Sequence, residues 1–145
     1  MESLVPVIAL VSIASAVGIA YRLLRGRGHR VRRKQQIDLR RLRATNNGIL
    51  STALGKQATL IQFSTQYCGQ CPGVRRQLAQ LEHRHGGLIH LEVDITERLN
   101  VAARFGINQT PTVFLLNSKG ELVYRVGGVP NLSKLTQELE KLGVK

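Results

Sequence analysis

The sequence predicts a small α/β domain, with a mixed central sheet and helices on both faces, preceded by one apolar helix. Apolar, β-branched runs at 58–63, 88–93, 112–116 and 122–126 indicate four strands. Stretches of helical periodicity separate the first three runs, which favours parallel neighbours joined through helices. The turn residues at 117–120 join the last two runs as a hairpin.

Four helices are expected between and around these strands. A short helix is predicted over 50–54, and a longer one follows the cysteine pair as far as Arg84. Residues 97–105 and 132–142 suit two more, and Asn131 can cap the last of them. The predicted order of the domain is therefore α-β-α-β-α-β-β-α.

The N-terminus carries an uncharged apolar run, residues 4–21, which Leu23 and Leu24 extend past Arg22. About 20 apolar residues span a bilayer as a helix, and an arginine near its end can snorkel to the surface. We therefore expect a transmembrane helix within residues 1–25. A buried core helix fits less well because the run has no polar face. A cleavable signal peptide also fits less well, because residues 1–3 include no basic residue.

The net charge of +12 is unevenly distributed. Ten of the 21 basic residues fall within 22–43, where Asp38 is the only acidic residue. We expect residues 26–44 to form a basic juxtamembrane linker that is attracted to anionic lipid headgroups, and 45–145 to form the folded domain. Nucleic-acid binding is disfavoured because no aromatic residues interleave with the arginines. By the positive-inside rule, the domain is expected on the cytoplasmic side.

Cys68 and Cys71 are the only cysteines, and two residues separate them. They lie between a predicted strand and a predicted helix, where a helix N-terminus can stabilise a thiolate. A Cys-x-x-Cys pair in such a place is the sequence signal of a redox site. Two alternatives remain open: a pair of unreactive buried thiols, or half of a zinc site with His83 and His85. The zinc reading lacks a second pair of cysteines.

Residues 50–142 resemble thioredoxin. The matching pieces stand in the family's order: 63–71 for the active-site strand and loop, 93–94, 110–112 and 126–127. A Cys-x-x-Cys motif alone is moderately specific, but a Thr-Pro about 40 residues later and the correct element order strengthen it. The resemblance implies a thioredoxin-like fold.

The resemblance also implies roles for individual residues. Cys68 would attack a substrate disulfide and Cys71 would resolve the mixed disulfide. Pro111 would follow a cis peptide bond opposite the cysteines, and Thr110 would offer backbone hydrogen bonds to an extended substrate. A trans proline that opens an edge strand is the alternative. The expected substrate-binding residues are Tyr67, Gly69, Gln70, Thr110, Pro111 and Gly127.

Several positions depart from the family pattern. Tyr67 replaces the usual tryptophan, Gln70 replaces a proline, and Pro72 follows the second cysteine directly. Gln62 stands where the family has a buried aspartate, and His90 stands where it has a lysine. We hypothesise that His90, with Gln62, or a water molecule serves as the proton relay. The alternative is that His90 is an ordinary strand histidine.

Together these features predict a membrane-anchored thiol-disulfide oxidoreductase that reduces protein or small-molecule disulfides. No cofactor or metal is expected beyond the Cys68–Cys71 pair, and electrons would come from another protein or a small thiol. Residues 4–24 would contact the membrane, and no nucleic-acid partner is expected. The alternatives are a non-catalytic scaffold, a metal-handling protein, or an oxidase or cytochrome-maturation reductase if the domain faces outward.

Overall fold

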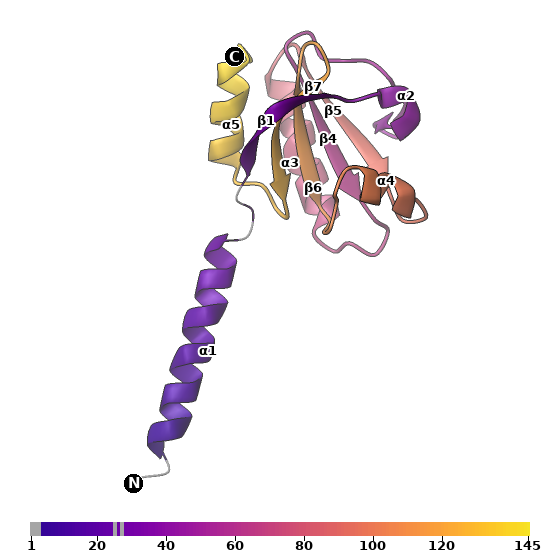
Figure 1. The fold of residues 1–145 in the computed structure, drawn as a ribbon. Helices are drawn as coiled ribbons and strands as arrows, with labels where there is room; N and C mark the ends of the chain where they lie inside the picture. Colours follow the sequence, from indigo (N-terminus) through magenta and orange to yellow (C-terminus); the bar gives the residue numbers. More distant parts are fainter. Residues whose placement is uncertain (1–3, 25, 27) are drawn as a thin grey trace.

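The computed structural model describes residues 4–24, 26 and 28–145 (Figure 1). Its helices are α1 (Leu4–Leu24), α2 (Leu39–Leu42), α3 (Cys71–Arg84), α4 (Leu99–Arg104) and α5 (Leu132–Lys141). Its strands are β1 (His29–Gln36), β2 (Thr45–Asn46), β3 (Ile49–Leu50), β4 (Ala58–Ser64), β5 (Leu88–Asp94), β6 (Thr112–Asn117) and β7 (Glu121–Gly127).

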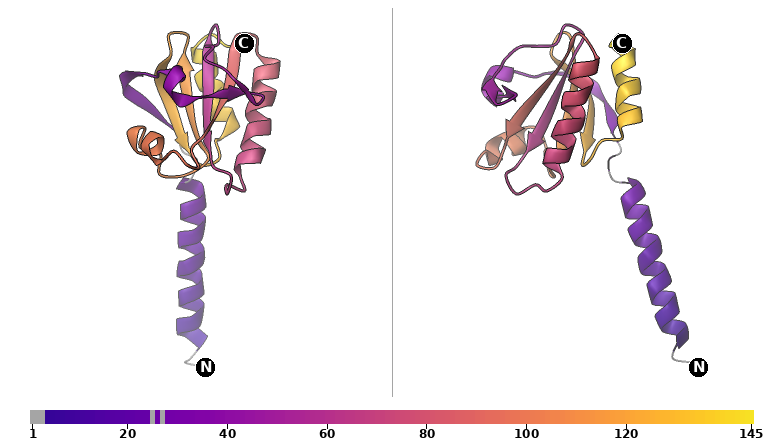
Figure 2. Two further views of the ribbon diagram at one scale, coloured as in Figure 1. Left: turned by 90° about the vertical axis from the view of Figure 1, so that its right-hand side faces the viewer. Right: turned by 180° about the vertical axis from the view of Figure 1, so that it is seen from behind.

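The described strands form one mixed sheet in the order β1-β7-β6-β4-β5-β2-β3. Strand β4 pairs in parallel with β5 and antiparallel with β6, and the β6–β7 hairpin continues the sheet. Helices α3 and α5 lie side by side on one face, while α2 and α4 cover the other (Figure 2). The predicted fold class, a mixed sheet between two helical layers, is confirmed.

Strand β4 forms the centre of the core, and all seven of its residues are buried. Side chains of a strand alternate between the two faces of the sheet. Ile61 and Phe63 therefore join the cluster beneath α2 and α4, whereas Leu60 joins the cluster beneath α3 and α5. Phe63 packs edge-on against Phe114 with ring centroids 4.8 Å apart. Burial on both faces explains why this strand is an unbroken apolar run in the sequence.

The prediction of a short helix over 50–54 is wrong. Thr45–Asn46 and Ile49–Leu50 instead form a two-stranded hairpin, in which Thr45 pairs with Leu50. Asn47 and Gly48 occupy the turn with φ of 49° and 83°. Asn-Gly is the preferred pair for such a turn, because both residues tolerate positive φ. Five residues are also too few to form a helix without strong tertiary support.

The segment predicted as a basic linker, 26–44, contributes two elements to the folded domain. Strand β1 pairs antiparallel with β7, beginning with His29 opposite Arg125. Beyond β1, Ile37, Leu39 and Leu42 are buried at 5% exposure or less. The folded unit therefore begins near His29 rather than at residue 45. The free edge of β7 and the exposed face of the sheet provide the partners for this segment.

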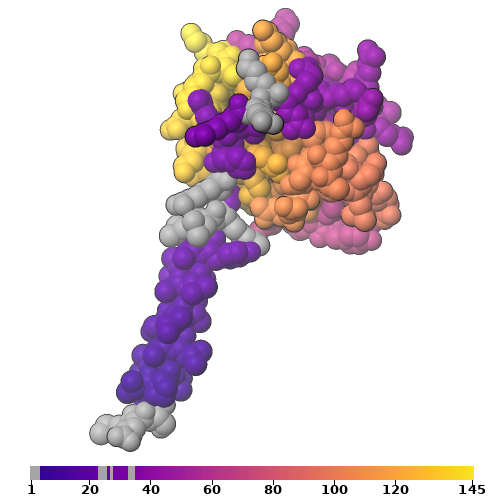
Figure 3. All heavy atoms as spheres, viewed as in Figure 1, coloured from indigo at the N-terminus to yellow at the C-terminus, as the bar shows by residue number. Residues whose placement is uncertain are grey.

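Helix α1 is exposed along its described length and stands clear of the domain in the space-filling view (Figure 3). Its apolar span, Leu4–Arg22, has 19 residues and a mean hydropathy of 2.2. At 1.5 Å per residue it measures about 28 Å, close to the roughly 30 Å of a bilayer's hydrocarbon core. By length and composition, the helix is able to cross a membrane or to act as a signal sequence.

Candidate active site

Cys68 and Cys71 form a disulfide at the junction of β4 and α3, with Cα atoms 5.4 Å apart. The Cys68 N–H donates to the Thr65 carbonyl at 3.1 Å, and the Cys71 N–H donates to the Cys68 carbonyl at 3.3 Å. Cys68 is half-buried, whereas Cys71 is 2% exposed. The two cysteines are therefore chemically unequal: only Cys68 presents substantial surface to a partner.

Helix α3 begins at Cys71 itself rather than after the cysteine pair, and Cys68 lies in the turn that precedes the helix. The Gln70 carbonyl accepts the first helical hydrogen bond, from the Val74 N–H at 3.2 Å. Pro72 is well accommodated there, because an N–H in the first turn has no helical acceptor. The positive end of the helix still faces the disulfide, which favours a thiolate.

The Thr110–Pro111 peptide bond is cis, as the resemblance implied. Strand register places Phe63 opposite Thr112, and Thr112 opposite Gly127. The Pro111 carbonyl accepts a hydrogen bond from the Gly128 N–H at 2.7 Å. The cysteine loop, Pro111 and Gly127 thus meet at one end of the sheet.

The remaining residues of the predicted groove occupy the cysteine loop and its neighbour. Tyr67 is 83% exposed, and Gly69 and Gln70 are exposed beside it. The hydroxyls of Thr65 and Thr110 lie 3.4 Å apart and link the cysteine loop to the proline loop. Thr65 is absent from the sequence-based site, because no motif distinguishes it from other loop threonines.

Gln62 lies beneath the cysteine pair and is fully buried. Its Nε2 donates to the Cys71 carbonyl at 3.0 Å and to Ser64 Oγ at 2.9 Å. Its Oε1 makes no hydrogen bond within the described part of the chain. The amide therefore ties the start of α3 to β4. Sequence reasoning missed Ser64, although it lies two residues along the same strand and so on the same face.

His90 is buried on β5, where it pairs in register with Leu60, while Gln62 pairs with Glu92. Burial, and then the charge of Arg75, lower the pKa of His90 to about 4. The imidazole is therefore neutral at pH 7. Among the described residues, no hydrogen bond joins its side chain to Gln62 or to either cysteine.

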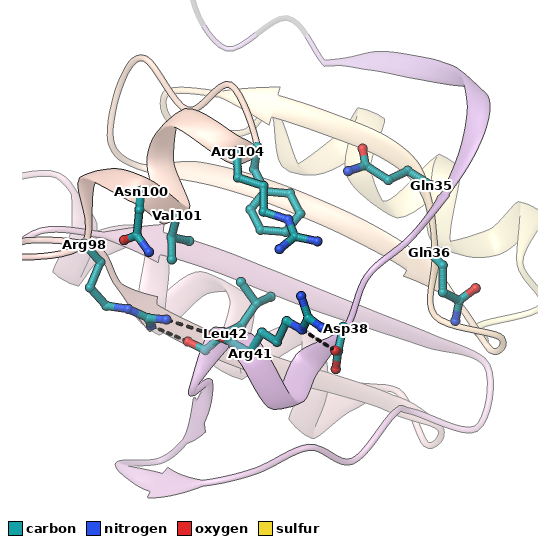
Figure 4. Close-up of a pocket in the computed structure, with 10 residues that line it drawn as sticks. Gln35, Gln36, Asp38, Arg41, Leu42, Arg98, Asn100, Val101 and Arg104 are labelled. Carbon is teal, nitrogen blue, oxygen red and sulfur yellow. Dashed lines mark hydrogen bonds and ion pairs between the residues drawn. The ribbon is translucent and has the colours of Figure 1, made fainter.

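A separate hollow of about 210 Å³ lies between β1, α2 and α4 (Figure 4). Arg98 donates to the backbone carbonyls of Arg41 and Leu42, and Arg41 pairs with Asp38 at 3.2 Å. Two of its arginines are thus committed to holding α2 in place. Neither cysteine lines this hollow, which lies on the face of the sheet covered by α2 and α4, whereas α3, which begins at Cys71, packs on the opposite face.

Within the described residues, no group of three His, Cys, Asp or Glu side chains is arranged to hold a metal ion. The site instead combines a Cys-x-x-Cys disulfide at a helix start, one accessible and one buried cysteine, and a cis proline beside them. These features define a thiol-disulfide oxidoreductase, in which the cysteine pair itself carries the electrons.

The thioredoxin family model matches residues 44–141, and the chain belongs to the thioredoxin family. The chain is 29% identical over 90 residues to human thioredoxin, covering 62% of this chain and 84% of that protein. It is 40% identical over 83 residues to the SPbeta prophage-derived thioredoxin-like protein YosR of Bacillus subtilis, covering 55% of this chain and 96% of that protein. Members of this family need no cofactor.

Solved structures agree with this assignment. Thioredoxin f from spinach chloroplast superposes with a TM-score of 0.52 at 25% identity, covering 61% of this chain and 78% of that structure. A mutant thioredoxin from Halobacterium salinarum superposes with a TM-score of 0.53 at 23% identity, over 60% of this chain and 75% of that structure. The second likeness concerns the fold alone.

Proposed function

We propose that this thiol-disulfide oxidoreductase is membrane-anchored and works as a reductase of protein disulfides. The observation that carries the proposal is the unequal burial of the cysteines at the start of α3: Cys68 is accessible and Cys71 is 2% exposed. A nucleophile must reach the substrate, whereas a resolving thiol must reach only its neighbour.

In the reductive direction the pair starts as a dithiol. The Cys68 thiolate attacks one sulfur of the substrate disulfide, and the departing substrate thiolate takes a proton from water. Cys71 then loses its proton and attacks Cys68 Sγ, which forms the Cys68–Cys71 bond and releases the second substrate thiol. Two electrons pass to the substrate. A protein dithiol, or two small thiols, must reduce the pair again.

Substrate binding is proposed along the cis-proline loop. The backbone of Thr110 would pair with an extended substrate segment, as in strand addition. Gly69, Gln70 and Gly127 would leave the groove shallow, and exposed Tyr67 would offer an apolar ring at its rim. Such a groove recognises backbone more than side chains and so accepts many sequences.

Proton transfer from Cys71 is the least constrained step. A buried histidine with a pKa of about 4 is a weak base, so a relay through His90 and Gln62 must compete with water. We predict that His90→Ala will alter the pH dependence of single-turnover resolution between pH 6 and 9 if the relay operates. Unchanged kinetics across that range would assign the step to water.

The membrane anchor is proposed from α1 and its flank. The apolar span carries no acidic residue, and the basic residues that follow it favour retention of that side in the cytoplasm. In a reducing compartment disulfides rarely persist as structural bonds, so a reductase role follows from this orientation. An outward-facing domain would favour an oxidase or a cytochrome-maturation reductase instead.

The test is the reduction potential of the cysteine pair in the full chain in detergent, equilibrated against glutathione and dithiothreitol. A value near the roughly −270 mV of thioredoxin supports a reductase, and one near the roughly −120 mV of a strong oxidant favours the opposite direction. Cys71→Ser should accumulate mixed disulfides through Cys68. A chain with no reversible couple and no mixed disulfide would be a scaffold.

A further inference from the structure

The chain enters the domain at the active-site end of the sheet. His29, the first residue of β1, pairs with Arg125 near the end of β7. Two residues further along β7, Gly127 pairs with Thr112, which in turn pairs with Phe63 just before the cysteine loop. Figures 1 and 2 show α1 leaving the domain from the end that carries the β4–α3 loop. The membrane helix and the disulfide are therefore at the same end of the sheet.

Two glycines define the path of the chain between the end of α1 and the start of β1. Gly26 has φ of +73°, and a Cβ added to it would overlap the Val129 carbonyl. A Cβ added to Gly28 would overlap the side chain of Tyr124. Any larger residue at these positions would push the connection away from β7 and the loop that follows it. The close approach ties the start of the domain to the loop next to Pro111.

Helix α1 and the active-site rim share one hollow of about 440 Å³. On one side the hollow is lined by Arg22 of α1 and by Gly26. On the other side it is lined by Gln70, Thr110 and the 128–129 loop. Arg22 closes the apolar span, so in a bilayer it lies at headgroup level. Gln70 stands between the two cysteines. The redox loop thus faces the headgroup layer across this hollow.

The length of the connection limits how far the site can move from the membrane. Four residues, 25–28, separate the end of α1 from the start of β1. Fully extended, the five steps from Leu24 to His29 reach about 18 Å. A folded protein of about 100 residues has a radius of gyration of about 13 Å, so it is too wide to enter beneath the active-site end. An extended chain segment, with a strand spacing of about 4.8 Å, fits there.

We propose that the substrate is a disulfide in a membrane protein, carried on an extended segment within a few residues of the bilayer surface. This inference rests on the proposed function, because it requires both a membrane anchor and a reductase. The exposed Tyr67 and the 41% exposed Val129 suit this location, since amphipathic and apolar side chains partition favourably into the boundary between headgroups and hydrocarbon. The short connection holds the active site at a fixed distance from the membrane, so only disulfides at that distance from the bilayer surface can reach Cys68.

The test uses the full chain reconstituted in phosphatidylcholine–phosphatidylglycerol vesicles with a single-span peptide. The peptide carries one disulfide loop, placed either four or forty residues beyond its transmembrane helix, so both versions are confined to the same membrane. The protein is pre-reduced with a dithiol, the excess is removed, and substrate thiols are labelled over time. We expect the near disulfide to be reduced at least tenfold faster than the far one.

The matched variant inserts a helical spacer of four EAAAK repeats after Gly26, which adds about 30 Å. Reduction of the same disulfide in a soluble peptide verifies that the variant remains folded and active. We expect the spacer to abolish or invert the preference for the near substrate while leaving soluble turnover unchanged.

Equal rates for near and far substrates in the unmodified chain, or a preference that the spacer does not alter, would overturn the inference. If the chain reduces none of the three substrates, the proposed reductase function fails and the inference falls with it.

Discussion

The redox site and the N-terminal segment 28–44 attach to the same sheet but contribute different things to the molecule. The redox site is small and polar, and beneath it Gln62 Oε1 makes no hydrogen bond within the described residues. The N-terminal segment closes the edge of β7 and buries Ile37, Leu39 and Leu42, yet it contains no reacting group. Chemistry and stability are therefore carried by separable regions. A variant in the redox site should therefore alter catalysis with little effect on stability, and a variant in segment 28–44 should alter stability with little effect on catalysis.

The largest expected effect is on chemistry. Cys68→Ser should lower turnover of a peptide disulfide by about a thousandfold or more, because it removes the nucleophile. In reducing buffer its free energy of unfolding should change by no more than about 0.5–1 kcal/mol, since the site is half-buried. Turnover assays and urea unfolding of the reduced proteins test both parts. Substantial residual turnover would contradict the assignment of Cys68.

Leu42→Ala should have the opposite effect, lowering stability while leaving the redox chemistry unchanged. Leu42 is 1% exposed, and truncating a buried leucine lowers the free energy of unfolding by about 2–5 kcal/mol. The reduction potential of the folded protein should stay the same. Leu50→Ala is the matched control, because Leu50 is 65% exposed and its loss should cost less than about 0.5 kcal/mol. Equal destabilisation by the two variants would mean that the segment is only loosely docked.

His90, buried on β5, gives a pH-dependent effect on stability. Its pKa is about 4 in the fold and 6.5 in the unfolded chain, so the unfolded chain binds more protons between these values. Stability from this group is complete above pH 6.5 and is lost as the pH falls towards 4. Lowering the pKa from 6.5 to about 4 corresponds to about 3 kcal/mol of stability. Denaturant titrations at pH 7 and pH 4 should show the wild type losing about that much more than His90→Gln.

The smallest expected effect concerns the ion pair that joins β1 to α5. Arg30 Nε lies 2.8 Å from Glu138 Oε2. Burial raises the pKa of Glu138, but hydrogen bonds from Lys141 and Arg30 outweigh it, and the pKa lies below its usual value. Because Arg30 is largely exposed, Arg30→Ala should cost less than about 1 kcal/mol, and salt should reduce that cost. A larger, salt-independent loss would show that the ion pair, and not apolar burial, secures this edge.

The sequence by itself determined the redox site and most of the elements around it. The cysteine spacing, the apolar run of β4 and the turn before β7 are local patterns, and each depends on residues only a few positions apart. The cis bond at Pro111 followed from the family resemblance. The Asn47-Gly48 turn also carries a local hairpin signal, which the prediction of a helix over 50–54 overlooked.

Only the tertiary structure decided where the N-terminal segment goes. Strand β1 is rich in arginine and lacks the alternation that marks a strand, because its pairing with β7 uses backbone hydrogen bonds that any side chain permits. Ile37 and Leu42 are apolar residues in a basic stretch, and their burial depends on a face that distant strands supply. For the same reason, the approach of Arg22 to the rim of the redox site could not be inferred from sequence: it follows from the entry of β1 at that end of the sheet.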